Sequence, residues 1–291
     1  MEHPMTSRPR RSVLYVPASN EKALAKLPGL ACDAVIIDLE DAVAPGEKVA
    51  ARGRLEAVFA DRPASGPELV IRVNALSGEW GMDDLRAARE CRPDAILIPK
   101  VDSPRDILAA DEELDRLEAN PDMRLWAMIE TPRAMLNIGT IAELGRDRAA
   151  RLACLVAGTN DLAKDTGVRV TPDRRWLTGW LQQIVLAARA AHIDALDGVM
   201  NEFRDLDAFA AECAQGAEMG FDGKTLIHPA QIAPANAAFS PSAAGIAEAE
   251  AIVSAFAAPE HAGRGVIALD GRMVERLHLE QARRLLAKAG R

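Results

Sequence analysis

Two acidic residues, Glu130 and Asp161, each follow an apolar segment that is typical of a buried strand. Glu130 comes directly after segment 125–129, and Asp161 comes after segment 152–157 and the short stretch 158–160. Two carboxylates at the same edge of one sheet can hold a divalent metal ion between them. Asp161 has an alternative role, because it could simply begin a helix. A metal site is therefore expected if both segments are strands of one sheet.

Short apolar segments recur along the chain, with helical segments between them. Most are continuous apolar runs, as expected for strands of a parallel sheet that is buried on both faces. The intervening segments are rich in Ala, Leu, Glu and Arg and have the 3.6-residue period of amphipathic helices. The predicted strands are 12–17, 34–38, 69–73, 95–99, 125–129, 152–158, 195–200 and 224–228.

Eight strands alternating with helices are typical of a (β/α)8 TIM barrel, and the repeat fills about 230 residues, close to the ~250 usual for that fold. A doubly wound open sheet is the competing α/β architecture. We favour the barrel because polar residues follow many different strands. The predicted domains are a barrel over 8–233 and a C-terminal helical extension over 234–291, with a break at 258–265.

Polar residues follow almost every predicted strand, and in a barrel these strand ends meet at one mouth. They include Asp38, Glu40, Asp41, Arg72, Asn74, Lys100, Glu130, Asp161, Lys224 and His228. The available metal ligands are oxygens, without a Cys or His cluster, which favours Mg²⁺, with Mn²⁺ as a substitute.

Individual residues of this set have distinct expected roles. Glu130 and Asp161 would bind the metal directly, and the acids 38, 40 and 41 would act through water in the outer shell. Arg72 can clamp a substrate carboxylate through two parallel N–H groups. The alternative for Arg72 is a structural ion pair with one of the acids at the mouth. His228 precedes Pro229 at the end of the last strand and is expected to line the mouth.

The composition excludes several classes of protein. The formal net charge is −8 at pH 7, which argues against nucleic acid as a partner because phosphate binding needs a basic face. No segment approaches the ~20 apolar residues of a membrane span. The four cysteines, Cys32, Cys91, Cys154 and Cys213, are far apart. We expect buried free thiols in a reduced, cytoplasmic protein.

The ordered set of motifs resembles the citrate lyase β-subunit-like branch of the HpcH/HpaI aldolase family, which includes malyl-CoA and citramalyl-CoA lyases and malyl-CoA thioesterases. The resemblance runs from Arg11 to about Leu286. The matching stretches are RSVLYVP at 11–17, DLEDAV at 38–43, IRVN at 71–74, IPKV at 98–101, IETP at 129–132, GTNDL at 158–162, GFDGK at 220–224, IHPAQ at 227–231 and LDGRMV at 269–274.

The resemblance implies a TIM barrel with Mg²⁺ held by Glu130 and Asp161, and with Arg72 binding the carboxylate of a 2-oxo or 2-hydroxy acid. It also implies that Asp270 is catalytic and comes from a neighbouring subunit, in a homotrimer or hexamer. CoA would lie across the mouth, near Arg11, Lys100 and His228.

The implied function is a Mg²⁺-dependent lyase that cleaves malyl-CoA or citramalyl-CoA into a 2-oxo acid and acetyl-CoA. The alternatives are a malyl-CoA thioesterase on the same site, a subunit of a citrate lyase-like complex, and a non-catalytic 2-oxo acid binder. The chain departs from the branch after Asp270: where an Asp and then Pro-His are usual, it has Glu275, Arg276, Leu277 and His278. Leu277 therefore stands where a proline is expected.

Overall fold

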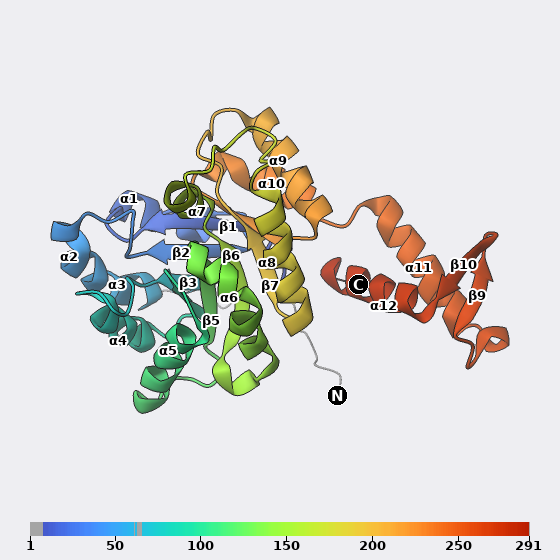
Figure 1. Cartoon of the computed structure of the whole chain (residues 1–291), viewed down its shortest axis with the longest axis horizontal. Helices are drawn as coiled ribbons and strands as arrows, with labels where there is room; N and C mark the ends of the chain where they lie inside the picture. Colours follow the sequence, from blue (N-terminus) through green and yellow to red (C-terminus); the bar gives the residue numbers. More distant parts are fainter. Residues whose placement is uncertain (1–7, 61, 63–65, 291) are drawn as a thin grey trace. The chain divides into compact units, whose positions relative to one another are not determined.

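The computed structural model describes residues 8–60, 62 and 66–290 (Figure 1). The chain separates into two units, one from Arg10 to Ala238 and the other holding the residues from Phe239 onward. We describe each unit by itself.

The first unit is built on a closed barrel of eight parallel strands, in which each strand pairs with the next and β8 pairs with β1. The strands are β1 Ser12–Pro17, β2 Ala34–Asp38, β3 Glu68–Arg72, β4 Ala95–Ile98, β5 Arg124–Ile129, β6 Leu152–Ala157, β7 Asp194–Asp197 and β8 Gly223–Leu226. The predicted (β/α)8 barrel is confirmed, and every predicted strand is present with small shifts at its ends.

Helices follow the strands and cover the outside of the barrel, as a parallel sheet requires. They are α1 Glu21–Leu24, α2 Lys48–Gly53, α3 Leu55–Ala60, α4 Gly81–Cys91, α5 Pro104–Arg116, α6 Pro132–Glu143, α7 Thr159–Thr166, α8 Thr178–Ala191, α9 Leu206–Met219 and α10 Ile232–Ala238. Short 3-10 helices lie at Leu27–Gly29, Pro45–Glu47, Leu144–Arg146, Arg148–Ala150 and Pro229–Gln231.

Helix α10 belongs to the barrel unit, although we predicted that the extension begins at residue 234. It packs against β1, β8 and α9. Its Asn236 accepts a hydrogen bond from the Ser12 hydroxyl at 2.7 Å and donates one to the Ala31 carbonyl at 2.9 Å. These contacts attach the helix to the first strand of the barrel.

The barrel interior is filled by alternate residues of the strands, because successive strand side chains point to opposite faces. The apolar part of this interior includes Val13, Ile36, Val70, Trp126, Met128 and Val156. At the amino-terminal ends of the strands, the Arg10 guanidinium pairs with Glu68 at 2.7 Å and Asp194 at 2.6 Å and lies over the Trp126 ring. Arg10 therefore compensates part of the negative charge of the two acids at that end of the barrel.

The second unit contains α11 Ala243–Ala257, a short 3-10 helix at Pro259–His261, an antiparallel hairpin of β9 Val266–Leu269 and β10 Arg272–Glu275, and α12 Arg276–Lys288. The hairpin corrects our expectation of a wholly helical extension. Its two-residue turn is Asp270-Gly271, with φ of 50° and 75°. An Asp-Gly pair with two positive φ angles is a common hairpin turn, and it places Asp270 at the tip.

Leu277 does not disturb the start of α12. The helix begins at Arg276, and His278 Nδ1 accepts a hydrogen bond from the Glu275 N–H at 2.9 Å, as in a capping box. Leu277 is half exposed. Replacing the expected proline therefore leaves the local fold of this segment regular.

Two expectations from composition can be compared with the structure. Within the described ranges, no helix is long and apolar enough to cross a membrane. All four cysteines are free; three are buried and Cys91 is partly exposed.

Candidate active site

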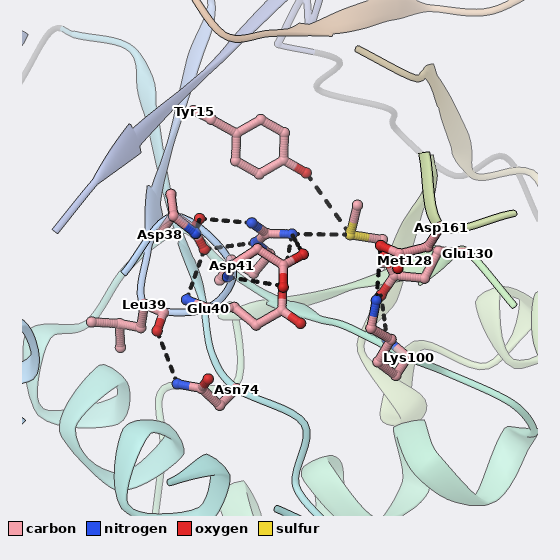
Figure 2. A network of polar contacts seen from close by, with 12 residues as sticks. Tyr15, Asp38, Leu39, Glu40, Asp41, Asn74, Lys100, Met128, Glu130 and Asp161 are labelled. Atoms are coloured by element: carbon pink, nitrogen blue, oxygen red, sulfur yellow. Dashed lines mark hydrogen bonds and ion pairs between the residues drawn. The ribbon is translucent and has the colours of Figure 1, made fainter. Parts of the chain in front are cut away.

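The carboxyl ends of β1, β2, β3 and β5 present polar side chains to the barrel interior. The alternation that points Val13, Ile36, Val70 and Trp126 inward brings their strand neighbours two and four positions further on to the same face. These neighbours are Tyr15, Asp38, Arg72, Met128 and Glu130. Figure 2 shows Tyr15, Asp38, Met128 and Glu130 together. Met128 Sδ lies 3.7 Å from Arg72 Nη1.

Arg72 is buried and forms ion pairs with Asp38, the last residue of β2, and with Glu40 in the loop that follows. Its Nε and Nη2 each donate to one oxygen of Asp38 at 2.6 Å, a two-bond contact that fixes the guanidinium plane. Its Nη1 lies 2.9 Å from Glu40 Oε2 and 3.7 Å from Met128 Sδ. The guanidinium carbon is also 4.9 Å from the centre of the Tyr15 ring. The edge that carries Nη1 is thus the part of Arg72 that could meet a substrate.

Glu40 is buried beside Arg72, whereas Asp41 is mostly exposed. Burial raises the pKa of Glu40 to about 7, and the neighbouring acids Asp41 and Glu130 add to the effect, while the charge of Arg72 opposes it. A carboxyl group with a pKa near neutrality can change charge when a ligand binds.

The loop that follows Asp38 and carries Glu40 is held in place by Lys48. The buried ammonium donates to the Leu39 and Glu40 carbonyls at 3.1 and 2.9 Å and to Asn74 Oδ1 at 2.7 Å. Asn74 in turn donates to the Leu39 carbonyl at 2.9 Å. All three N–H groups of the ammonium are used, so Lys48 is a structural anchor of this loop.

Glu130 has no solvent exposure, and its two carboxylate oxygens differ in their hydrogen bonding. Oε1 accepts the Lys100 N–H at 2.7 Å, but Oε2 is buried without a hydrogen-bond partner. Burial raises the pKa of Glu130, while the ammonium and the backbone N–H of Lys100 act in the opposite direction. A buried carboxylate oxygen without a partner is costly unless a cation or a proton completes it.

Asp161 lies close to Glu130 through a shared contact with Lys100. The Lys100 ammonium is 2.9 Å from Asp161 Oδ2 and 3.4 Å from Glu130 Oε1 (Figure 2). Partial burial raises the pKa of Asp161, but the hydrogen bond and charge of Lys100 outweigh it, so the net direction is downward. Asp161 is also in the first turn of α7, where a negative charge is favoured.

Local sequence fixes the two acids. After Glu130, Thr131 caps α6 by accepting the Ala134 N–H at 3.0 Å, and Pro132 occupies the first helical position, so the strand ends at the acid. Before Asp161, Gly158 passes so close to Glu130 that an added Cβ would lie 2.3 Å from the Glu130 Cβ. Glycine is required there by close approach.

The residues present fit a Mg²⁺ ion better than a metal that needs several side-chain ligands. Glu130 Oε2 lacks a partner, and Asp161 supplies a second carboxylate nearby. In the described part of the chain, no group of three or more His, Cys, Asp or Glu could hold a metal ion. Mg²⁺ commonly uses one or two carboxylates and completes its shell with water and substrate.

Two other predicted residues, Arg11 and Lys224, lie away from the mouth. Arg11 precedes β1 and pairs with Asp33 at 2.7 Å, at the end of the strands opposite to Glu130. Its position contradicts the expected role in binding CoA at the mouth. Lys224 points outward from β8, where its ammonium pairs with Asp197 at 2.9 Å, so it is also absent from the mouth. Strand direction explains the place of Arg11, and the alternation of side chains explains that of Lys224.

His228 follows β8 and is therefore at the same end of the barrel as the acids. Its ring stacks on Phe203 with 4.6 Å between ring centres, and its Nδ1 accepts the Ala230 N–H at 3.1 Å. Asp270 lies in the second unit, at the tip of the hairpin, and is exposed.

The sequence analysis missed Tyr15 and Met128 as parts of the site. Both lie on the inward face of their strands, and Met128 is two positions before Glu130. Tyr15 is the single tyrosine of the chain. Following the alternation of inward and outward side chains to the end of each strand would have identified both residues.

Comparisons with known proteins agree with this geometry. A family model described as HpcH/HpaI aldolase/citrate lyase matches residues 11–229. The chain is 48% identical to a (3S)-malyl-CoA thioesterase of Cereibacter sphaeroides, over 97% of this chain and 95% of the relative. It is 33% identical to the mitochondrial citramalyl-CoA lyase of Homo sapiens, over 97% of this chain and 86% of the relative.

A solved structure has the same fold over nearly the whole chain. It is the crystal structure of protein CitE from Mycobacterium tuberculosis in complex with magnesium, acetoacetate and coenzyme A, with 28% identity and a TM-score of 0.76. The match covers 98% of this chain and 99% of that chain. The chain is therefore an enzyme of the HpcH/HpaI aldolase/citrate lyase family, related to CoA-ester thioesterases and lyases.

Proposed function

We propose that this enzyme hydrolyses malyl-CoA, or a closely similar 3-hydroxyacyl-CoA, with Mg²⁺ as its metal. The observation that carries the proposal is 48% identity to a (3S)-malyl-CoA thioesterase over 97% of the chain. The buried Glu130 and the partly exposed Asp161 beside it add support. The sequence analysis put the lyase reaction first. The higher identity to thioesterases than to lyases reverses that order.

The substrate carboxylate is proposed to bind at the Nη1 edge of Arg72. Asp38 holds the other edge of the guanidinium through two contacts of 2.6 Å, so the group is oriented before substrate arrives. A guanidinium fixed in this way recognises a carboxylate with little loss of conformational freedom. The role predicted for Arg72 and the structural ion pair considered as its alternative are thus compatible.

Glu130 and Asp161 are proposed as the direct ligands of Mg²⁺, and Mn²⁺ is expected to substitute. When bound, the metal supplies Lewis-acid polarisation of a substrate oxygen. Glu130 contributes its unpartnered Oε2, and Asp161 contributes a carboxylate whose pKa is lowered by Lys100 despite partial burial. Asp38, Glu40 and Asp41 are proposed to orient water around the site. CoA is proposed to cross the mouth near Lys100 and His228, without Arg11.

Asp270 is proposed as the acid–base residue, supplied by a neighbouring subunit of a homotrimer or hexamer. In hydrolysis it takes a proton from the attacking water and returns it to the leaving CoA thiolate, which yields the free diacid and CoA. A hairpin tip is a suitable support for such a residue, because it projects from its own unit without a fixed side-chain partner. The cytoplasmic location remains a prediction, as does the absence of nucleic-acid and membrane partners.

Lyase activity is the second candidate, favoured by 33% identity to a citramalyl-CoA lyase over 97% of the chain. In that reaction the substrate hydroxyl loses its proton as the C–C bond breaks, which gives a 2-oxo acid and the enolate of acetyl-CoA. Asp270 supplies a proton to the enolate carbon, so the proton lost and the proton gained balance. Both reactions use the same set of residues. The remaining alternatives, a citrate lyase-like complex subunit and a non-catalytic binder, predict no turnover of free acyl-CoA.

The test offers malyl-CoA and citramalyl-CoA separately to the full-length enzyme with Mg²⁺ and identifies the products by mass spectrometry. Malate plus CoA from malyl-CoA supports hydrolysis. Glyoxylate plus acetyl-CoA, or pyruvate plus acetyl-CoA from the second substrate, supports the lyase instead. Absence of turnover with both substrates contradicts both candidates.

A further inference from the structure

The Lys100 ammonium lies where a cation is needed, between two carboxylates of the barrel mouth. It is 2.9 Å from Asp161 Oδ2 and 3.4 Å from Glu130 Oε1. We propose that Lys100 is a built-in counter-ion that holds these carboxylates in the metal-free enzyme and that a divalent ion displaces it. The inference rests on the proposed metal site and adds a role for Lys100 that differs from CoA binding.

The backbone of Lys100 holds Glu130 independently of the Lys100 side chain, so the ammonium can move away from the two carboxylates. Its N–H donates to Glu130 Oε1 at 2.7 Å, and its φ is 51°, in the left-handed region that few residues other than glycine adopt. Such strain often marks a functional position. The backbone contact can persist while the ammonium moves away, because the Lys100 side chain is 33% exposed and borders solvent. Glu130 thus stays oriented during the exchange.

The charges explain why both cations cannot occupy the same place. Glu130 is buried, and without a cation its charge would be uncompensated beside Asp161, which is costly. Lys100 reduces this cost in the metal-free state. A divalent ion held by the same two carboxylates would meet the ammonium as a like charge at close range. The free energy of metal binding is therefore less favourable by the amount by which the ammonium stabilises the metal-free site.

The contacts of Lys100 differ from those of the other lysine near Asp161. Lys164 is on α7, its side chain is 76% exposed, and its ammonium is 3.6 Å from Asp161 Oδ1. Within the described part of the chain it makes no contact with Glu130, so it does not bridge the two acids. Lys164→Met makes the same change of side chain, loss of the ammonium with most of the chain length kept, and is the matched control.

The experiment titrates Mn²⁺ into metal-free full-length enzyme and follows free Mn²⁺ by electron paramagnetic resonance, without substrate. The proteins are wild type, Lys100→Met, Lys100→Gly and Lys164→Met. Glycine suits the positive φ and retains the backbone N–H, so it serves if the methionine variant does not fold. We expect about tenfold tighter binding for both Lys100 variants, the effect of about 1.4 kcal/mol, and a change below about twofold for Lys164→Met.

A second measurement is the unfolding temperature in the presence of a chelator. Lys100→Met should lower it more than Lys164→Met does, and added Mg²⁺ should restore more stability to the first variant than to wild type. If wild type binds Mn²⁺ saturably and the Lys100 variants bind it equally or more weakly, the proposed role of Lys100 is overturned but the metal site is not. Absence of saturable binding in wild type overturns the proposed metal site and this inference together.

Discussion

Arg72 and Asp38 are joined by two parallel hydrogen bonds of 2.6 Å inside the barrel, at the ends of adjacent strands. Asp38 also accepts the Glu40 N–H at 2.9 Å, so one carboxylate orients both the guanidinium and the following loop. Breaking a buried pair leaves an uncompensated charge and costs about 3–5 kcal/mol. Asp38 is thus expected to control both the stability and the geometry of the site.

Asp38→Asn should therefore lower kcat/KM for malyl-CoA by roughly 100-fold, because a small displacement of Arg72 misplaces the substrate. The control is Asp41→Asn, since Asp41 is mostly exposed and 3.8 Å from Arg72. Steady-state kinetics and urea unfolding of both variants provide the measurements. Similar kinetics for the two variants would contradict the special position of Asp38.

Gly158→Ala should disturb the metal site without removing any ligand. The new methyl group would lie 2.3 Å from the Glu130 Cβ and 2.9 Å from its Oε2, so Glu130 must shift. We expect a loss of stability of about 1–3 kcal/mol from overpacking and Mn²⁺ binding weakened by about tenfold or more. Gly139→Ala, in α6 with open space around it, should be neutral or stabilising by about 0.5–1 kcal/mol. Tight Mn²⁺ binding by Gly158→Ala would be inconsistent with this packing.

Glu40 should make the stability of the metal-free enzyme depend on pH in the acid-to-neutral range. Burial raises its pKa from 4.5 to about 7 in the folded state. A raised pKa means that its contribution is fully present below about pH 4.5 and is lost as pH rises towards 7. Glu40→Gln cannot ionise, so it should gain stability relative to wild type over this range, by at most about 3 kcal/mol.

Urea unfolding at pH 5 and pH 8 with a chelator measures this difference. Glu47→Gln, an exposed glutamate at the end of the same loop, is the control. If Glu40→Gln and wild type differ by the same free energy at both pH values, the assigned environment of Glu40 is wrong.

Asp270 should be tested by Asp270→Asn rather than by alanine. Asparagine tolerates the φ of 50° at the hairpin tip, whereas alanine would also strain the turn. We expect turnover to be abolished while Mn²⁺ and 2-oxo acid binding are retained. Wild-type activity of this variant would show that the acid–base residue lies elsewhere.

The proposed origin of Asp270 in another subunit has its own test. Asp270→Asn and Glu130→Gln are each expected to be inactive, but co-expressed chains should form mixed oligomers with some complete sites. Random mixing would give complete sites at up to about a quarter of positions. Activity in the mixture supports a shared site. Inactive mixed oligomers contradict it.

The barrel and its inward acids were predictable from sequence because each strand is a continuous apolar run that ends in a polar residue. Glu130 is the clearest case: five buried residues precede it, and Thr131 and Pro132 start the next helix at once. Periodicity of this kind determines local structure and the end of the barrel at which a residue lies.

The pairing of side chains was not predictable in the same way. Arg11, Lys100 and Lys224 all lie in or next to strands. Arg11 nevertheless pairs with Asp33 at the opposite end, Lys224 points outward, and of the three only Lys100 reaches the acids. Strand direction and a shift of one residue decide these outcomes. The hairpin around Asp270 was also missed, because strands of four residues leave little periodic signal, although Asp-Gly is a turn signal.

The most direct test of the account measures Mg²⁺-dependent turnover of malyl-CoA by wild type, Glu130→Gln and Asp165→Asn. Asp165 is an exposed acid on the helix that carries Asp161, so its variant controls for loss of a negative charge. The account predicts turnover by wild type and Asp165→Asn that requires Mg²⁺, and none above background by Glu130→Gln. Turnover by Glu130→Gln at the wild-type rate, or full wild-type activity in excess chelator, would contradict it.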